Sequence, residues 1–312
     1  MTSEQHLRSV PTHFGVDRAS RNAPIMPSKV ILVRHGQSAG NVNEELYATI
    51  PDPDLPLTPL GWEEARAAGR AMQEGLDKEV GLPAGESVHF VVSPYVRTME
   101  TFHGIAAAWV DPKEFDDVPD PDERRERWYK ALNKRGLTWH EDPRVREQDF
   151  GNYQDPKSMK LFKRERHLYG PFFYRFPHGE SSADVFDRAS TFLDSLWRSF
   201  EAQKSRNYVI ITHGATIRVL LTRYFRFTID QYNRLSNPKN CEMVVLAHDG
   251  EGKLMLLGRS ELTHGGEVPG DEEGGEGGGN DQITGYSFYK HLRLNPPSKI
   301  PRARKVGISG PL

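Results

Sequence analysis

The sequence predicts an α/β domain with a mostly parallel central sheet. Two apolar, β-branched runs, residues 30–33 and 208–211, each end close to a His-Gly pair, His35-Gly36 and His213-Gly214. Such runs are typical of buried strands. Segments with helical periodicity separate these runs from further short apolar runs, and strands that alternate with helices favour a single α/β unit.

The expected elements follow one another from residue 28 onward. Helix 182–200 is the clearest, because its apolar residues recur at i, i+3 and i+4. Thr58-Pro59 is a typical helix start, with Thr as N-cap and Pro at the first helical position. Residues 111–136 are dense in charge and Pro, and they are expected to be an exposed excursion with room for one helix. The remaining expectations are strands at 29–33, 89–94, 208–212, 242–247 and 254–257, a hairpin turn at 249–252, and helices at 58–75, 95–109 and 215–224.

Composition divides the chain into three parts. Residues 1–27 are expected to be a flexible extension, residues 28–260 the folded domain, and residues 261–312 a low-complexity tail. From Glu261 to Asp281 the tail holds seven acidic residues, no Lys or Arg, and many Gly, whereas its last part is basic. Such a segment cannot bury enough apolar surface to fold alone. It is expected to be solvated, or to dock on this chain or on a partner.

The charge balance excludes some classes of partner. The 312 residues carry 41 Lys plus Arg and 43 Asp plus Glu, a net charge of -2. That balance gives no global field for nucleic acid or an anionic membrane, so a small anionic substrate would be held by a local cationic pocket. No apolar run approaches the ~18 residues that a membrane span needs. No prediction of oligomeric state follows from the composition.

Cysteine usage and the N-terminus bear on the compartment. Cys241 is the only cysteine, so no intrachain disulfide is possible and a reducing compartment is favoured. The first 27 residues lack the apolar core of a secretory signal. We therefore expect a cytoplasmic location, with import into an organelle as the alternative.

Polar residues gather where the predicted strands end. Open α/β sheets place ligand chemistry at the carboxyl ends of their strands. If the two His-Gly strands are neighbours, His35 and His213 face one crevice with Arg34 beside them. A pocket of His and Arg with no metal-ligand set suits a phosphoryl group. Taken singly, each residue has an ordinary structural explanation; taken together, they favour one phosphoryl-transfer pocket.

These motifs resemble those of the histidine phosphatase superfamily, in its phosphoglycerate mutase-like branch. Residues 34–41 match the family's Arg-His-Gly-Glu/Gln-Ser opening with an Asn three residues on. Later motifs of the family are matched in order at 57–65, 93–101, 147–151, 179–181 and 212–218, with Glu64 in place of the usual Gln. The resemblance spans about residues 29 to 250. It implies a three-layer α/β/α sandwich with a mostly parallel central sheet, of the phosphoglycerate mutase-like type.

The resemblance also implies a role for each candidate residue. His35 would attack phosphorus and become a phosphohistidine, while Arg34 and Arg97 bind the non-bridging oxygens. His213 would complete the pocket as a further donor when protonated. Glu147 would be the general acid for the leaving oxygen and then the base for water, which requires a pKa near working pH. Substrate binding is expected from Gln37, Ser38, Asn41 and Gly214, and neither a metal nor another cofactor is expected.

Arginines close to Glu147 in the sequence oppose that requirement on its pKa. Arg144 and Arg146 would lower the pKa of Glu147 unless their side chains point elsewhere. If Glu147 is not the acid, Glu180 or Asp149 is the next candidate.

The predicted function is a phosphatase that hydrolyses a phosphomonoester of a small or medium-sized substrate. A cofactor-dependent phosphoglycerate mutase is an alternative, although residues 46–57 lack the Phe-Thr-Gly-Trp type of segment that such mutases have. A second phosphate would be read by Arg175 or by a lysine within 157–176. A non-catalytic phosphoryl-binding module is a further alternative. A metal hydrolase is disfavoured because His-Glu-x-x-His and Cys-x-x-Cys spacings are absent from the sequence.

Overall fold

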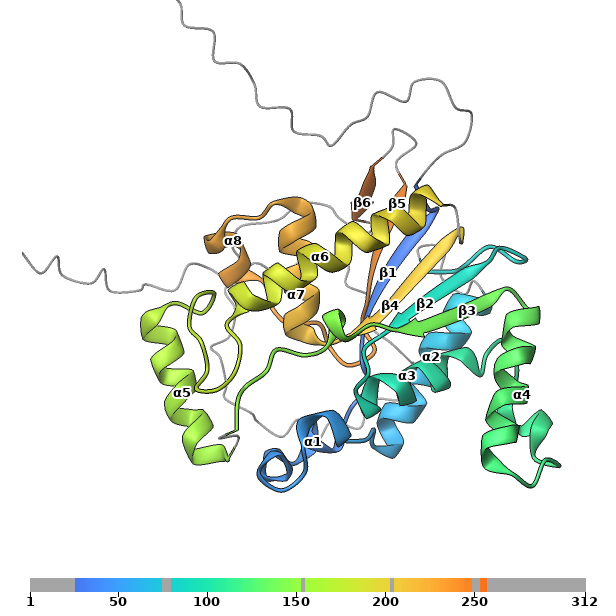
Figure 1. Ribbon diagram of the computed structural model, residues 1–312, viewed down its shortest axis with the longest axis horizontal. Coiled ribbons are helices and arrows are strands. Elements are labelled where there is room, and N and C mark those ends of the chain that lie inside the picture. The colour runs from blue at the N-terminus through green and yellow to red at the C-terminus, as the bar shows by residue number, and fades with distance from the viewer. Residues whose placement is uncertain (1–25, 75–79, 153–154, 203–204, 249–252, 257–312) are drawn as a thin grey trace, which may run out of the picture.

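A six-stranded sheet, in the spatial order β3-β2-β4-β1-β5-β6, forms the centre of the molecule (Figure 1). The structure is a computed structural model that describes residues 26–74, 80–152, 155–202, 205–248 and 253–256. Its parallel strands are β1 (Lys29–Arg34), β2 (Val88–Val92), β3 (Leu137–Glu141) and β4 (Asn207–Thr212). Strand β5 (Met243–His248) is antiparallel to β1, and β6 (Leu254–Leu256) is antiparallel to β5. The expected mostly parallel sheet is confirmed.

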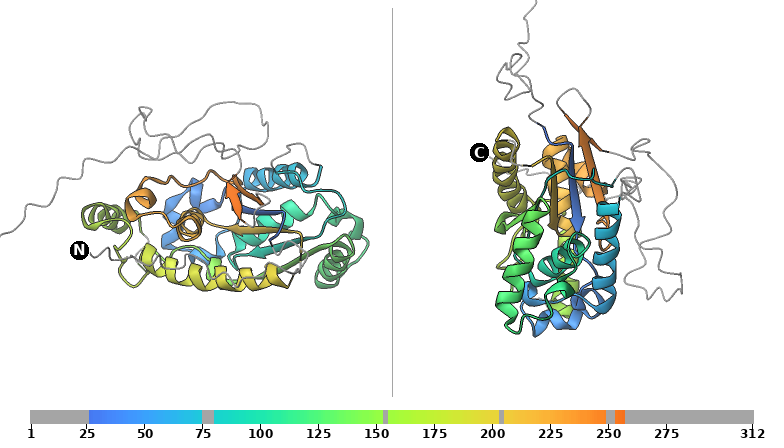
Figure 2. Two further views of the ribbon diagram at one scale, coloured as in Figure 1. Left: turned by 90° about the horizontal axis from the view of Figure 1, so that it is seen from above. Right: turned by 90° about the vertical axis from the view of Figure 1, so that its right-hand side faces the viewer.

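Helices cover both faces of the sheet, as expected of a three-layer sandwich. The side chains of Val30 and Leu32 join one buried cluster with α6 and α7, whereas Ile31 and Val33 join a second cluster with α2 and α3. Helices α6 and α2 accordingly lie on opposite sides of the sheet in both views of Figure 2. The helices are α1 (Ala39–Val42), α2 (Pro59–Glu74), α3 (Val96–Ala106), α4 (Pro121–Lys134), α5 (Pro156–Tyr169), α6 (Ser182–Glu201), α7 (Gly214–Phe225) and α8 (Ile229–Arg234). Short 3-10 helices are η1 (Glu44–Ala48), η2 (Asp52–Asp54), η3 (Pro112–Phe115) and η4 (Pro143–Val145).

The structure adds elements that the periodicity did not indicate. Strand β3 was missed because it lies at the sheet edge, where only Leu137 of its five residues is buried. Helix α5 begins with Asp155 capping the N–H groups of Lys157 and Ser158. Met26 was assigned to the flexible extension, but it is buried in the cluster beneath α6 and α7. The rest of that extension, the turn at 249–252 and the tail from 257 lie outside the described residues.

The start of α2 fits closely against the loop that follows β1. The Thr58 hydroxyl accepts a hydrogen bond from the Gly61 N–H at 3.1 Å, as its predicted N-cap role requires. A Cβ atom on Gly61 would lie 2.2 Å from the Gln37 carbonyl oxygen, so only glycine fits there. This contact fixes the position of the loop that carries His35.

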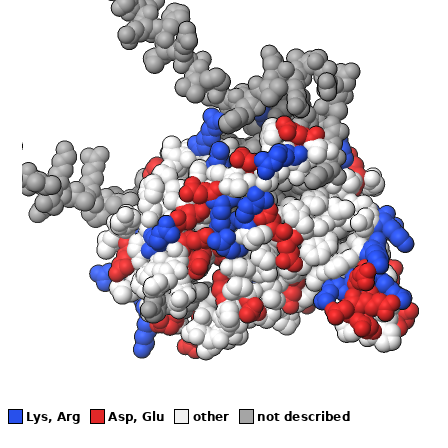
Figure 3. Space-filling model, in the orientation of Figure 1, with Lys and Arg blue, Asp and Glu red and all other residues white. Residues whose placement is uncertain are grey.

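The face shown in Figure 3 carries acidic and basic side chains intermixed, including the region of α4. No broad area of one sign is visible on this face, in keeping with the net charge of -2. None of the helices in the described ranges combines the length and the apolarity that crossing a bilayer requires.

Candidate active site

The parallel pairing of β1 with β4 brings the two His-Gly pairs together. Arg34 and Thr212 are register partners at the carboxyl ends of these strands. The residue that follows each strand is a histidine, and the ring centroids of His35 and His213 lie 5.2 Å apart. Both side chains are buried, at 3% and 0% exposure. The two His-Gly strands are thus neighbours, and the two imidazoles lie side by side at the carboxyl ends of these strands.

The His35 ring is held in one tautomer. Its Nδ1 lies 2.7 Å from the Gly36 carbonyl oxygen, which can only accept, so Nδ1 carries the hydrogen. The other ring nitrogen, Nε2, then holds the lone pair. Burial, together with the positive charges of Arg97 and Arg34, holds the pKa of His35 well below its ordinary value. His35 is thus a neutral imidazole whose Nε2 carries no hydrogen.

His213 presents its opposite nitrogen to the crevice. Ser93 Oγ lies 2.8 Å from Nε2, whereas the buried Nδ1 has no hydrogen-bond partner and lies 3.9 Å from Glu147 Oε2. Burial, and then Arg97, lowers the pKa of His213 well below its ordinary value. With Ser93 donating to Nε2, a neutral His213 still offers an Nδ1–H donor. It therefore needs no protonation to act as the donor that the sequence led us to expect.

Two arginines flank the histidines with part of each guanidinium unengaged. Arg34 Nη1 donates to the Pro238 carbonyl at 2.7 Å, and Arg97 Nη1 lies 2.9 Å from Asp52 Oδ1. In both side chains Nε is buried without an acceptor. Leaving a buried donor unpaired costs roughly 1–3 kcal/mol. An anion bound between the arginines would satisfy these groups and His213 Nδ1 together.

Glu147 lies next to His213 as a buried carboxyl group among charged neighbours. Burial raises its pKa to about 6, against the opposing charges of Arg97 and Arg34. The nearby negative charge of Asp52 adds to the rise. A carboxyl group with this pKa is partly protonated near neutral pH, so it can both donate and accept a proton.

The arginines next to Glu147 in sequence point away from its carboxyl group. Arg144 pairs with Asp142 at 2.6 Å and Arg146 with Glu180 at 2.5 Å. Glu180 also pairs with Arg188 at 3.0 Å, so both of its carboxylate oxygens are engaged by arginines. Of the fallback acids, Glu180 thus acts in a structural ion pair.

Arg188 of α6 fixes the loop that carries Glu147. Its Nη1 donates to the carbonyl groups of Arg144 and Arg146, and its Nη2 donates to the carbonyl of Glu147 at 3.0 Å. The side chain is only 11% exposed. One guanidinium therefore holds three carbonyl groups of the loop that leads to Glu147.

Most of the predicted substrate-binding residues already use polar atoms in hydrogen bonds within the protein. Ser38 is buried and caps α1, in a reciprocal pair with Asn41. Asn41 Oδ1 also accepts from Asn240, so its amide nitrogen is the end that can donate to a substrate. The Gln37 side-chain oxygen accepts from Thr58 at 2.8 Å. Gly214 begins α7 directly after His213, and its lack of a side chain admits Asn237.

Sequence reasoning missed the residues that position the others. Asp52 lies in η2, 45 positions before its partner Arg97, and no local pattern relates the two. Arg188 is a charged residue three positions after the buried Val185, beside the apolar stripe of α6. This position is the one sequence signal that pointed to a role for Arg188. Tyr95 packs edge-on to His213 with ring centroids 5.0 Å apart.

Among the described residues, no cluster of three His, Cys, Asp or Glu side chains has the arrangement of a metal site.

The fold and this site together define a family. A sequence model of the histidine phosphatase superfamily (branch 1) matches residues 30–118 and 123–259. The chain belongs to the histidine phosphatase superfamily.

The relatives of this chain include a protein named phosphoglycerate mutase-like and one named acid phosphatase. A phosphoglycerate mutase-like protein of Arabidopsis thaliana is 40% identical over 238 residues, 73% of this chain and 77% of the relative. A broad-range acid phosphatase of Saccharomyces cerevisiae is 30% identical over 287 residues, 72% of this chain and 86% of the relative. Among solved structures, a mycobacterial glucosyl-3-phosphoglycerate phosphatase has a TM-score of 0.52 at 19% identity, covering 73% of this chain and 96% of that one. That likeness confirms the fold.

The arrangement predicts that Lys cannot replace either clamping arginine. Lys lacks the planar fork that lets Arg97 hold Asp52 and an anion at once. Arg34→Lys and Arg97→Lys should each weaken binding of orthovanadate roughly tenfold or more, since each loses a charge-assisted hydrogen bond. Isothermal calorimetry measures this, with the exposed Arg127→Lys as control. If both variants are folded and bind orthovanadate as tightly as the natural protein, the clamp is assigned to the wrong residues.

Proposed function

We propose that this chain is a phosphatase that hydrolyses phosphomonoesters through a phosphohistidine at His35. The observation that carries the proposal is the setting of His35 Nε2. It is a lone-pair nitrogen on a fixed neutral ring that packs against His213 and lies near the charges of Arg97 and Arg34. In these three neighbours Arg34 Nε, Arg97 Nε and His213 Nδ1 are buried without a hydrogen-bond partner. This combination provides a nucleophile and an anion-binding shell in one place.

In the first half-reaction, the Nε2 lone pair of His35 attacks phosphorus. The bond from phosphorus to the leaving oxygen breaks, and its electron pair stays on that oxygen. Glu147 in its protonated form supplies the proton, so the alcohol leaves neutral. Arg34, Arg97 and His213 Nδ1–H hold the non-bridging oxygens, where the charge of the transition state resides.

In the second half-reaction, Glu147 acts as the base and His35 Nε2 is the leaving group. The Glu147 carboxylate takes a proton from water as the water oxygen attacks phosphorus. The P–N bond breaks, and its electron pair returns to Nε2. Inorganic phosphate leaves, and His35 and Glu147 regain their starting protonation states. A pKa of about 6 suits Glu147 for both steps.

The cavity next to the crevice favours a substrate with one phosphate over a bisphosphate. A cavity of about 440 Å³ borders Asp52 and Tyr95, the residues in contact with Arg97 and His213. Its charged lining residues are Asp149 and Asp52, the partner of Arg97, so the lining supplies no cation for a second anionic group. Arg175, the suggested reader of a second phosphate, instead pairs with Asp184 at 2.5 Å. These features favour a neutral alcohol as the leaving group. They disfavour mutase action on phosphoglycerates.

The proposal predicts that His35→Ala abolishes turnover. Removing a nucleophile should lower kcat by at least roughly a thousandfold, as nucleophile deletions in other covalent enzymes do. The assay is phosphate release from a panel of sugar phosphates, nucleoside monophosphates and aryl phosphates. His167→Ala, an exposed histidine on α5, is the control and should be unchanged. Phosphate release by a folded His35→Ala protein at the natural rate would refute the assignment, and no release by the natural protein from any phosphomonoester would support the binding-module alternative.

Glu147 sets a pH dependence with a definite sign. Its pKa is raised to about 6, so the donating form is lost as pH rises through that value, and kcat on alkyl phosphates should fall above about pH 6. Glu147→Gln should remove this fall, because an amide has no proton to lose. It should also slow alkyl phosphates far more than an activated aryl phosphate, which needs little protonation of its leaving group.

Comparing pH profiles of the natural protein and Glu147→Gln on both substrate types checks this. Ionisation of the substrate itself affects both proteins alike and cancels. Equal losses of kcat/KM, which reports the first half-reaction alone, on both substrate types would mean that Glu147 is not the acid. The same selective loss in Asp149→Asn would then assign the role to Asp149.

A further inference from the structure

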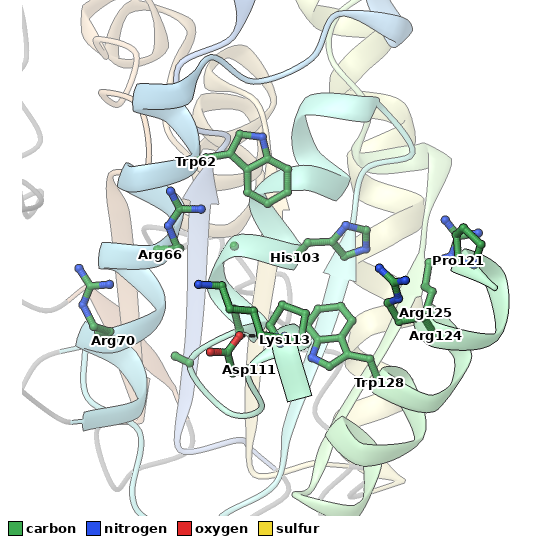
Figure 4. A pocket seen from close by; sticks show the side chains of 14 residues that line it. Trp62, Arg66, Arg70, His103, Asp111, Lys113, Pro121, Arg124, Arg125 and Trp128 are labelled. Carbon is green, nitrogen blue, oxygen red and sulfur yellow. Dashed lines mark hydrogen bonds between the residues drawn. The ribbon is translucent and has the colours of Figure 1, made fainter. Parts of the chain in front are cut away.

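A second cavity lies away from His35, between α2, α3 and the segment from η3 to α4 (Figure 4). Its volume is about 1000 Å³, and its lining contains none of the residues assigned to the catalytic crevice. The two sites share helices, since α2 begins at the loop after β1 and α3 carries Arg97 near its start. Nothing in the proposed reaction uses this second cavity.

Three cations border this cavity without a carboxylate partner. Arg66 and Arg70 stand one turn apart on α2, and like charges at this spacing repel each other. Lys113 points from η3 toward α2 in Figure 4. Across the described ranges of the chain, none of these three side chains takes part in an ion pair. Asp111, the carboxylate of the lining, caps η3 by accepting from the backbone N–H of Lys113.

Aromatic rings form another part of the wall. Trp62 of α2 is half-buried and reaches toward the cavity, while His103 of α3 and Trp128 of α4 pack at 5.6 Å between ring centroids (Figure 4). Trp128 Nε1 donates to the Val110 carbonyl at 2.8 Å, and His103 Nε2 bonds to the Tyr129 hydroxyl. Burial, with a smaller effect of Arg125, lowers the pKa of His103 to about 4, so this ring is uncharged. The wall therefore offers flat, neutral surfaces.

We propose that this cavity binds a nucleoside di- or triphosphate. Its base would pack against Trp62, and its phosphates would bind Arg66, Arg70 and Lys113. A base uses the aromatic wall because every base has a flat face that stacks on such rings, and adjacent phosphates match a group of unpaired cations. The acidic segment of this chain, Glu261 to Asp281, could meet the cations but has no Phe, Tyr or Trp to pack against Trp62. A nucleotide uses both halves of the cavity.

The test is binding of the non-hydrolysable β,γ-imido analogue of ATP to the full chain. Calorimetry should show one site, and the indole fluorescence should change on binding. Adenosine, which lacks phosphates, and tripolyphosphate, which lacks a base, should each bind roughly tenfold or more weakly, because each loses one set of contacts. Tripolyphosphate binding as tightly as the nucleotide analogue would contradict a role for the aromatic wall.

Variants locate the site. Arg66→Ala with Arg70→Ala should weaken binding of the analogue roughly tenfold or more, and Trp62→Ala should remove most of the fluorescence change. The exposed arginine and lysine of α4 that lie outside the cavity give a matched control: Arg127→Ala with Lys130→Ala removes the same charge and should leave binding unchanged. Arg97→Lys, in the catalytic crevice, should also leave it unchanged.

Two results would overturn the proposal. One is that the analogue does not bind the natural protein at millimolar concentration. The other is that binding is lost in Arg97→Lys but kept when Arg66 and Arg70 are both alanine, which would place the analogue in the catalytic crevice. Thermal unfolding of each variant shows that it is folded. Because the readout is binding, the outcome is independent of whether the chain proves to be a phosphatase.

Discussion

The parallel pairing of β1 with β4 is the contact on which the rest of the site depends. Six consecutive residues of each strand are in register, ending with Arg34 beside Thr212. A slip of one residue would turn every side chain of a strand to the opposite face, and the two separate core clusters forbid that slip. The register therefore fixes the separation of the two imidazoles. The Gly36 carbonyl then fixes which His35 nitrogen is free.

Electrostatic conditions in the crevice are set by competition between burial and charge. Burial makes both histidines neutral and raises the pKa of Glu147, and the arginines add to the first effect while they oppose the second. The buried positive charge of Arg97 is tolerable because Asp52 pairs with it. Arg188 and Glu180 in turn hold the loop of Glu147 and divert Arg146 from its carboxyl group. The result is a neutral imidazole at His35 and a carboxyl group at Glu147 whose pKa is about 6, the two states that the proposed reaction requires.

The sequence predicted site residues best where His and Arg side chains follow the apolar runs of the predicted strands. The proximity of the two histidines to Arg34 and Arg97 could be predicted because strand ends in an open α/β sheet converge. The roles proposed for these residues and for Glu147 are those that the family resemblance implies. The pairing of Asp52 with Arg97 could not be predicted, since it joins a 3-10 turn to a helix with no local spacing rule. Strand β3 escaped for a related reason, because an edge strand with one buried residue shows no apolar run. The use of Ser38 and Asn41 in a capping box is visible only once α1 is in place.

Identifying which histidine nitrogen becomes phosphorylated is the most direct test of the proposed reaction. A phosphomonoester reaction stopped in alkali within the first turnover should yield a phosphoenzyme, and its peptide and phosphohistidine isomer can be identified by mass spectrometry and ³¹P NMR. The hydrogen bond from Nδ1 to the Gly36 carbonyl predicts phosphate on Nε2 of His35. Phosphate on Nδ1 or on His213 would contradict the account, as would turnover in which no phosphoenzyme forms.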